Sequence, residues 1–145
     1  MLTMSKSALS VAQASTYYTE SYSQDDYYSE GKTVAGHWFG HGAEALVLRG
    51  EVTPEQFAAV LNGHDPQTGH VLVPPHNETR RAGWDATFLA PKSVSLQALI
   101  GNDERLRVAH RSAVHAALTE LEKYVQTRQH RGTEWVTTGN MVAAQ

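Results

Sequence analysis

The longest regular pattern in this sequence is helical, and it runs from Asp103 to Tyr124. Apolar and weakly polar side chains recur there every three or four residues, which is the spacing of one face of an α-helix. The stripe consists of Leu106, His110, Ala113, Ala117, Leu121 and Tyr124. Asp103 stands where a capping residue is expected. The pattern predicts one long helix that opens at Asp103 and turns this stripe toward the core.

In the rest of the chain, shorter patterns predict further helices and strands. Helices are expected over residues 10–18, 43–48 and 55–61, and the last of these has Thr53 as its cap and Pro54 at its first position. Strands are expected over residues 2–4, 71–73, 83–88 and the β-prone tail 133–145. Because the strands do not alternate with helices at βαβ spacing, the pattern favours an α+β fold with helices packed on an antiparallel sheet.

Length and composition narrow the class of protein. A chain of 145 residues suits one domain, which we expect to span residues 1–145. With no cysteine, disulfides, thiolate metal sites and cysteine nucleophiles are excluded, and a reducing cytoplasm is permitted. The formal charge of −3 gives no global attraction to nucleic acid, so DNA binding would need a local basic patch. No apolar run is long enough for a membrane helix.

The strand expected over residues 83–88 divides its side chains between two faces. Trp84, Ala86 and Phe88 share one face, which we expect to be buried, and Asp85 shares the other with Thr87. Asp85 is therefore a candidate general base, because a carboxylate on a strand is held in a fixed position. The alternative is a solvated strand residue or a capping partner.

Three basic residues bracket this strand and are candidates for binding phosphate groups by charge-assisted hydrogen bonds. They are Arg80, Arg81 and Lys92. A solvated basic edge is equally consistent with them.

Four of the six tyrosines form two adjacent pairs, Tyr17-Tyr18 and Tyr27-Tyr28. Helical spacing places Tyr18 with the core residues and Tyr17 about 100° away, on the more polar side. A phenol can act as a nucleophile when a base or a metal activates it. The alternative is that the tyrosines are half-exposed structural aromatics, which is the common role of this side chain.

The histidines are weaker candidates. His37 and His41 are four residues apart, but Gly36, Gly40 and Gly42 argue against a helix that would bring them together as metal ligands. His110 falls within the long stripe and is expected to be a core histidine, and His115 is expected to be solvated on the opposite side.

Taken in order, these segments resemble the N-terminal portion of the TrwC/TraI-type (MobF) conjugative relaxases. The likeness rests on the opening MLT, the two tyrosine pairs, GHGAEALVLRGEV, the DPQTG turn, the block RAGWDATFLAPKSVSLQALIG, the long helix and TTGN. WDATFLAPKSVSLQAL is its most specific part. The resemblance implies a partial relaxase palm of the HUH type, with an antiparallel sheet flanked by helices.

The resemblance also implies a reaction. A tyrosine at the position of Tyr17 attacks a scissile DNA phosphate and keeps the 5′ end as a phosphotyrosyl ester. A second tyrosine, at Tyr27, serves a later strand transfer, and Asp85 matches the acidic residue that takes or orients the proton. The implied partners are single-stranded DNA at a transfer origin and other conjugation proteins, without a membrane and in the cytoplasm.

The family's metal ligands form a His-x-His cluster with a third histidine upstream, and they follow the TTGN strand. None of the eight histidines here matches them. We therefore expect an incomplete relaxase, truncated before these ligands, that does not itself bind the family's divalent cation, Mg²⁺ or Mn²⁺, and that nicks DNA poorly. The alternative is a non-catalytic single-stranded DNA-binding or interaction module derived from a relaxase.

Overall fold

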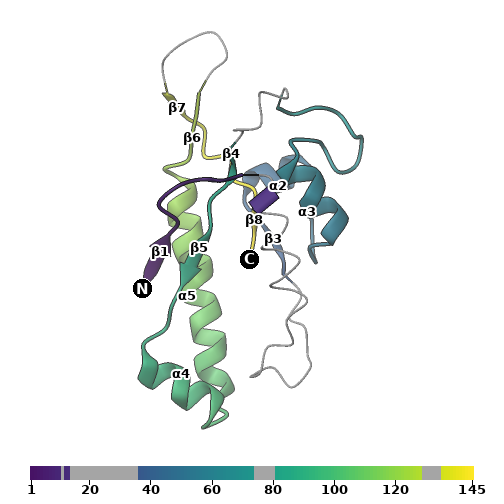
Figure 1. The fold of residues 1–145 in the computed structure, drawn as a ribbon. Coiled ribbons are helices and arrows are strands. Elements are labelled where there is room, and N and C mark those ends of the chain that lie inside the picture. Colours follow the sequence, from purple (N-terminus) through teal and green to yellow (C-terminus); the bar gives the residue numbers. More distant parts are fainter. Residues whose placement is uncertain (11, 14–35, 74–80, 129–134) are drawn as a thin grey trace. The chain divides into compact units, whose positions relative to one another are not determined.

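The computed structural model describes residues 1–10, 12–13, 36–73, 81–128 and 135–145. They belong to two compact units, which are described separately (Figure 1). The long-helix unit comprises Met1, residues 37–50 and residues 88–145, and the paired-strand unit comprises residues 2–36 and 51–87.

Two helices dominate the long-helix unit. Helix α4 (Lys92–Leu99) leads through a short turn into α5 (Glu104–Glu122), which has 19 residues (Figure 1). The main-chain N–H of Arg105 donates to the Asp103 carboxylate at 3.1 Å, and this bond satisfies one of the N–H groups left free at a helix start. The expected helix opening at Asp103 is confirmed.

Short strands and a small helix complete this unit. Strand β3 (Trp38–Phe39) pairs antiparallel with β8 (Ala143–Ala144), and β6 (Gln126–Arg128) pairs antiparallel with β7 (Trp135–Thr137). Helix α2 (His41–Ala45) follows β3 after a single residue, Gly40. The sequence pattern placed this helix at residues 43–48, so its start was expected two residues too late.

The described core of the long-helix unit is small. Its buried apolar side chains belong to Ala43, Leu48, Ala98 and Leu118. On α5 the buried row is Leu118 and Glu122, whereas Tyr124 is 69% exposed and lies beyond the last helical residue. The expected stripe was therefore wrong at Ala113, which is exposed, and at Tyr124, and the most buried row at the C-terminal end of α5 lies beside it.

The paired-strand unit contains one helix and two strand pairs. Helix α3 (Pro54–Leu61) begins as expected, because the hydroxyl of Thr53 accepts the N–H of Gln56 at 3.2 Å. Strand β1 (Leu2–Met4) pairs with β5 (Ala86–Phe88), and β2 (Leu9–Ser10) pairs antiparallel with β4 (Arg81–Gly83). Val52 and Leu61 are buried here.

Two expectations for this unit were wrong. The extended segment 83–88 is divided between β4 and β5, and Trp84 at the break is 58% exposed instead of buried. Each half of the segment pairs with a different N-terminal strand, so the side chains do not keep one alternation throughout. Residues 71–73 do not form a strand, and Val71 makes only an isolated bridge with His64.

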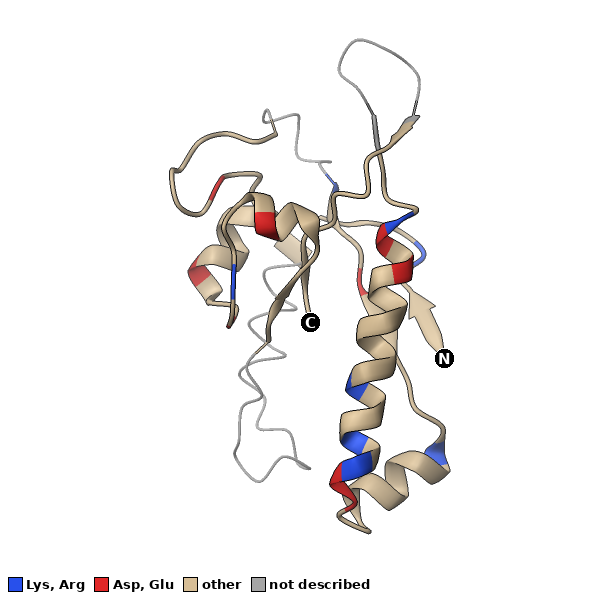
Figure 2. Cartoon of the chain, turned by 180° about the vertical axis from the view of Figure 1, so that it is seen from behind, with Lys and Arg blue, Asp and Glu red and all other residues tan. Residues whose placement is uncertain are grey.

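The α+β class is confirmed, since the described residues combine helices with small antiparallel sheets. Charged side chains gather toward the two ends of α5, with an uncharged stretch between them (Figure 2). No helix in the described part of the chain is long and apolar enough to cross a membrane. A single domain over residues 1–145 stays a prediction.

Candidate functional site

Asp85, the expected general base, lies at the break between β4 and β5 and is half-buried. Ser5 fixes its main chain from both sides. The N–H of Ser5 donates to the Asp85 carbonyl at 2.9 Å, and the N–H of Asp85 donates to the Ser5 hydroxyl oxygen at 3.3 Å. A residue held at both its donor and its acceptor presents its side chain in a defined direction.

Within the described residues, the Asp85 carboxylate makes one local contact, in which the Thr87 hydroxyl donates to it at 3.4 Å. This is a long hydrogen bond, and it leaves most of the acceptor capacity of the carboxylate available. Asp85 and Thr87 therefore lie on one side, as expected from the alternation, and the carboxylate can accept a proton or a further hydrogen bond.

The other expected site residues are dispersed among the described and undescribed parts. Arg81 is exposed at the start of β4, in the paired-strand unit, and Lys92 is exposed at the start of α4, in the long-helix unit. Tyr17, Tyr27 and Arg80 lie outside the described residues. Among the described residues, the structure thus brings Asp85 together with Ser5 and Thr87, and it does not bring Arg81 and Lys92 into one compact unit.

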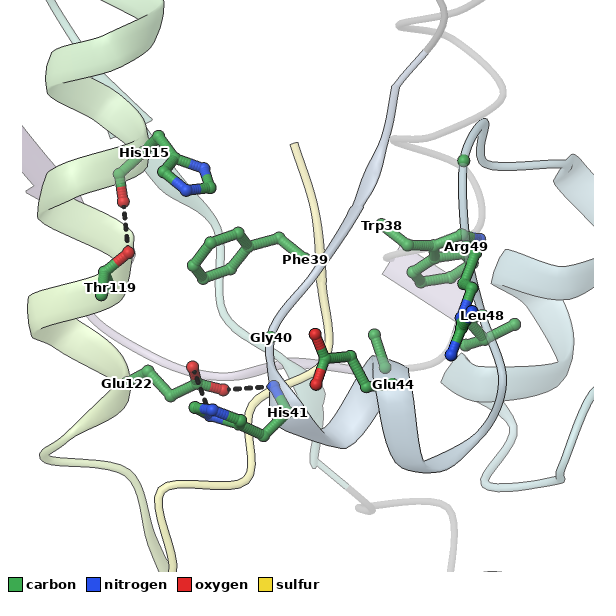
Figure 3. Close-up of a pocket in the computed structure, with 12 residues that line it drawn as sticks. Trp38, Phe39, Gly40, His41, Glu44, Leu48, Arg49, His115, Thr119 and Glu122 are labelled. Atoms are coloured by element: carbon green, nitrogen blue, oxygen red, sulfur yellow. Dashed lines mark hydrogen bonds and ion pairs between the residues drawn. The ribbon is translucent and has the colours of Figure 1, made fainter.

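A second polar centre, which the sequence reasoning missed, lies at the end of α5 in the long-helix unit. Glu122 is 4% exposed and is the one buried charged residue of the described chain. Its Oε1 accepts the main-chain N–H of His41 at 2.7 Å and that of Met141 at 3.2 Å. Its Oε2 lies 2.8 Å from Nδ1 of His41 (Figure 3). The carboxylate thereby caps α2, whose N-cap residue Gly40 has no side chain to do so.

Two glycines allow the tail of the chain to approach this centre. Gly40 has φ +105°, and a Cβ there would overlap the carbonyl oxygen of Met141. A Cβ on Gly42 would lie 2.8 Å from the same oxygen, which accepts the Gly42 N–H at 2.9 Å. The motif Gly40-His41-Gly42 is therefore explained by close packing of two main-chain segments.

The sequence did contain a signal for Glu122. It follows Leu118 by four residues, so both lie on one row of the helix surface, and a glutamate on a buried row needs hydrogen-bonding partners. The expected stripe, which ends at Tyr124, does not include this row.

A hollow of about 480 Å³ lies beside this centre, and Figure 3 shows its walls. It is lined from β3, α2, the loop after α2 and one face of α5, all within the long-helix unit. The rings of Phe39 and His115 meet edge to face, with centroids 5.0 Å apart and planes at 85°. His115 is exposed, as expected. Its ring contact with Phe39 was not predicted from the sequence.

The residues do not form a metal centre. No three histidine, cysteine, aspartate or glutamate side chains gather closely enough to hold a metal ion among the described residues. His41 opens α2, whereas His37 precedes β3, so the two do not share a helix.

Comparison with known proteins assigns the family. The family model described as TrwC relaxase matches residues 11–145. The multifunctional conjugation protein TraI of Escherichia coli (strain K12) is 39% identical over 138 residues, which cover 93% of this chain and 8% of TraI. A second Escherichia coli TraI is 38% identical over the same length. The chain therefore spans a small part of these curated relatives.

Solved structures agree with this assignment. A metal-free structure of conjugative relaxase TrwC in complex with OriT DNA has a TM-score of 0.74 and 35% identity, covering 98% of this chain and 48% of that one. A metal-bound TrwC complex with OriT DNA has a TM-score of 0.73 and 34% identity, with the same coverage. The chain matches about half of each solved relaxase. It belongs to the TrwC relaxase family.

Proposed function

We propose that this chain supplies the nucleophile-and-base part of a conjugative relaxase, which nicks one DNA strand at a plasmid transfer origin. The observation that carries the proposal is the likeness to TrwC solved with OriT DNA, at 35% identity over 98% of this chain. The WDATFLAPKSVSLQAL block and both tyrosine pairs lie within the residues that the family model matches. The partner is single-stranded DNA, and the place of action is the cytoplasm.

The proposed reaction is a transesterification by Tyr17. The phenolic oxygen forms a bond to the scissile phosphorus while the bond from phosphorus to the 3′ oxygen breaks. The phenolic proton passes to Asp85, and the departing 3′ oxygen takes up a proton to become a hydroxyl. In a second transfer, the Tyr27 phenolic oxygen forms a bond to another scissile phosphorus while the bond from that phosphorus to a 3′ oxygen breaks, and that oxygen leaves as a hydroxyl. Arg80, Arg81 and Lys92 hold neighbouring phosphates.

The position of Asp85 supports its role as base. A tyrosine hydroxyl has an ordinary pKa of about 10, so at neutral pH it needs a proton acceptor within hydrogen-bonding reach. The two bonds between Asp85 and Ser5 hold the main chain of that acceptor, and the long bond from Thr87 is the one hydrogen bond that its carboxylate accepts from the described residues. This combination suits a base that must meet a phenol in one orientation.

TrwC has been solved in metal-free and metal-bound forms. In the whole relaxase we propose Mg²⁺ or Mn²⁺, which would polarise the scissile phosphate. Among the described residues, no three histidine, cysteine, aspartate or glutamate side chains gather to hold a metal ion. We propose that residues 1–145 do not bind the cation, because none of the eight histidines matches the family's His-x-His ligands.

A covalent-adduct assay tests the proposal. Residues 1–145, and a chimera that continues them with the part of TrwC that this chain does not match, are incubated with single-stranded OriT DNA and Mg²⁺ or Mn²⁺. The chimera is expected to form a denaturation-resistant adduct that Tyr17→Phe abolishes and Tyr18→Phe preserves. Residues 1–145 alone should form at least about 100-fold less adduct than the chimera. An adduct that survives Tyr17→Phe would contradict the assignment of the nucleophile.

The alternative function is a non-catalytic single-stranded DNA-binding or interaction module. It predicts OriT binding by the same polypeptides without any adduct, and loss of that binding when Arg80 and Arg81 are both changed to glutamine. Arg111→Gln is the matched control, because Arg111 is an exposed arginine at a distance in sequence from the expected phosphate-binding residues.

A further inference from the structure

The hollow beside Glu122 has no role in the reaction proposed above. Its lining includes Trp38, Phe39, Glu44, Arg49, His115 and Glu122 (Figure 3). These residues come from segments about 70 positions apart in the sequence, and all of them belong to one compact unit. The hollow is thus a feature of the tertiary structure within that unit.

Aromatic rings form part of its wall. Phe39 and His115 point toward one another from β3 and α5, and the half-buried Trp38 lies next to Phe39 on the strand (Figure 3). Rings on adjacent segments offer flat surfaces on which an unstacked nucleobase can lie, and such stacking tolerates any base sequence. An aliphatic ligand would not need this arrangement.

Charged groups of both signs complete the wall. Arg49 is exposed and makes no ion pair with any residue of the described ranges, so its guanidinium is available to a phosphate. Glu44 is exposed on α2, and its carboxylate can accept hydrogen bonds from the amino groups of a base. The charge of Glu122 is already opposed by contacts to His41 and two main-chain N–H groups.

We propose that this hollow binds one unstacked nucleotide of single-stranded DNA, with its base against the Phe39–His115 rings and its phosphate on Arg49. The proposal rests on the proposed function, which supplies the DNA strand. A volume of about 480 Å³ accommodates a single nucleotide. A metal ion is a poorer fit, because no three suitable ligands gather in the described chain. A purely apolar ligand would leave Arg49 and Glu44 unused.

The experiment measures binding of single-stranded OriT DNA to the full 145-residue chain by fluorescence anisotropy at several salt concentrations. His115→Ala removes one ring from an exposed helix position and should weaken binding roughly tenfold. Arg49→Ala should weaken it roughly fivefold and reduce the slope of log K against log salt by about 0.7, the value for one phosphate contact on a single strand. Arg111→Ala, an exposed arginine of α5 outside the hollow, is the charge-matched control.

A second readout locates the nucleotide. The fluorescent base 2-aminopurine is placed at successive positions of the oligonucleotide, and one position should change its emission with the wild type and lose that change with His115→Ala. Thermal unfolding checks that each variant is folded. If the wild type binds DNA but both hollow variants behave like Arg111→Ala, the nucleotide site is wrong and the proposed function stands. If the wild type binds no single-stranded DNA, both proposals fail.

Discussion

Oε2 of Glu122 lies 2.8 Å from the imidazole Nδ1 of His41, while Oε1 of the same carboxylate accepts the His41 main-chain N–H at 2.7 Å. One buried side chain thus binds both the main chain and the side chain of one residue. Through the Met141 N–H it also holds the tail of the chain to the end of α5. Since a buried carboxylate is costly unless it is satisfied, this junction should be a determinant of stability.

Substitution of Glu122 should separate hydrogen bonding from charge. Glu122→Gln keeps an oxygen for the two main-chain N–H groups, so the free energy of unfolding should fall by about 1 kcal/mol. Glu122→Ala leaves both groups without a partner and should lower it by about 3 kcal/mol. Urea unfolding followed by tryptophan fluorescence measures both. Glu120→Ala, which removes an exposed glutamate on the same helix, should lower the midpoint far less than Glu122→Ala does, because its ion pair with Lys123 is exposed to solvent. Equal midpoints for Glu122→Ala and the wild type would show that the junction is not stabilising.

Gly40 is predicted to be intolerant of any side chain. It combines φ +105° with a Cβ position that overlaps the Met141 carbonyl oxygen, so Gly40→Ala should cost more than about 2 kcal/mol of unfolding free energy. Gly50 serves as the control for the cost of the positive φ alone, because its φ is +74° and nothing lies within 4 Å of its Cβ position. Gly50→Ala should cost only about 1 kcal/mol. Similar losses at the two positions would mean that the contact with Met141 contributes little.

The starts of α3 and α5 were predictable from the sequence because they depend on local chemistry, whereas the start of α2, which has no capping side chain of its own, was expected two residues too late. Thr53 and Asp103 cap α3 and α5 as expected, since each side chain bonds an N–H within three residues of itself. Which row of α5 is buried depends on distant segments, and the nearest of these to Glu122 is the tail around Met141. That information is absent from helical periodicity, which explains the error at Tyr124.

In the candidate site too, local features were predictable from the sequence and contacts between distant segments were not. Alternation along the chain correctly placed Asp85 with Thr87. It could not reveal that the expected strand breaks beside Asp85, because its two halves pair with separate N-terminal strands and the Ser5–Asp85 bonds join residues 80 positions apart. The exposure of Trp84 follows from the same break. Glu122 was missed for a related reason, since its partners come from two separate segments of the chain.

Ser5 is predicted to position Asp85 for the proposed reaction. Ser5→Ala removes the oxygen that accepts the Asp85 N–H and leaves the reverse main-chain bond intact, so the fold should lose about 1 kcal/mol at most. Adduct formation by the TrwC chimera should fall roughly tenfold, because a base displaced from its orientation transfers protons poorly. Ser7→Ala is the control, an exposed serine two residues away. If Ser5→Ala and Ser7→Ala form adducts equally fast, Ser5 has no positioning role.

The start of α5 should be sensitive to acid through Asp103. The Arg105 guanidinium donates to both carboxylate oxygens of Asp103, at 3.0 and 2.8 Å, and this bond together with the Arg105 main-chain N–H lowers the pKa of the Asp103 carboxyl below its ordinary value of 3.8. A carboxyl with a lowered pKa in the folded state stabilises that state above the unfolded pKa. The stabilisation is lost as the pH falls through the folded value. We therefore expect the first turn of α5 to fray only below about pH 4.

Two substitutions isolate this effect. Arg105→Gln should raise the pKa of the Asp103 carboxyl toward 3.8, which carboxyl-carbon NMR titration measures directly, because the first cause of the lowered value is the side-chain bond from Arg105. Asp103→Asn keeps a capping oxygen that does not titrate, so the helical circular dichroism of this variant should decline less between pH 4 and pH 2 than that of the wild type. The remaining decline reports the other carboxylates, such as Glu120, whose pKa is lowered by Lys123. Identical acid profiles for Asp103→Asn and the wild type would show that the cap does not govern this transition.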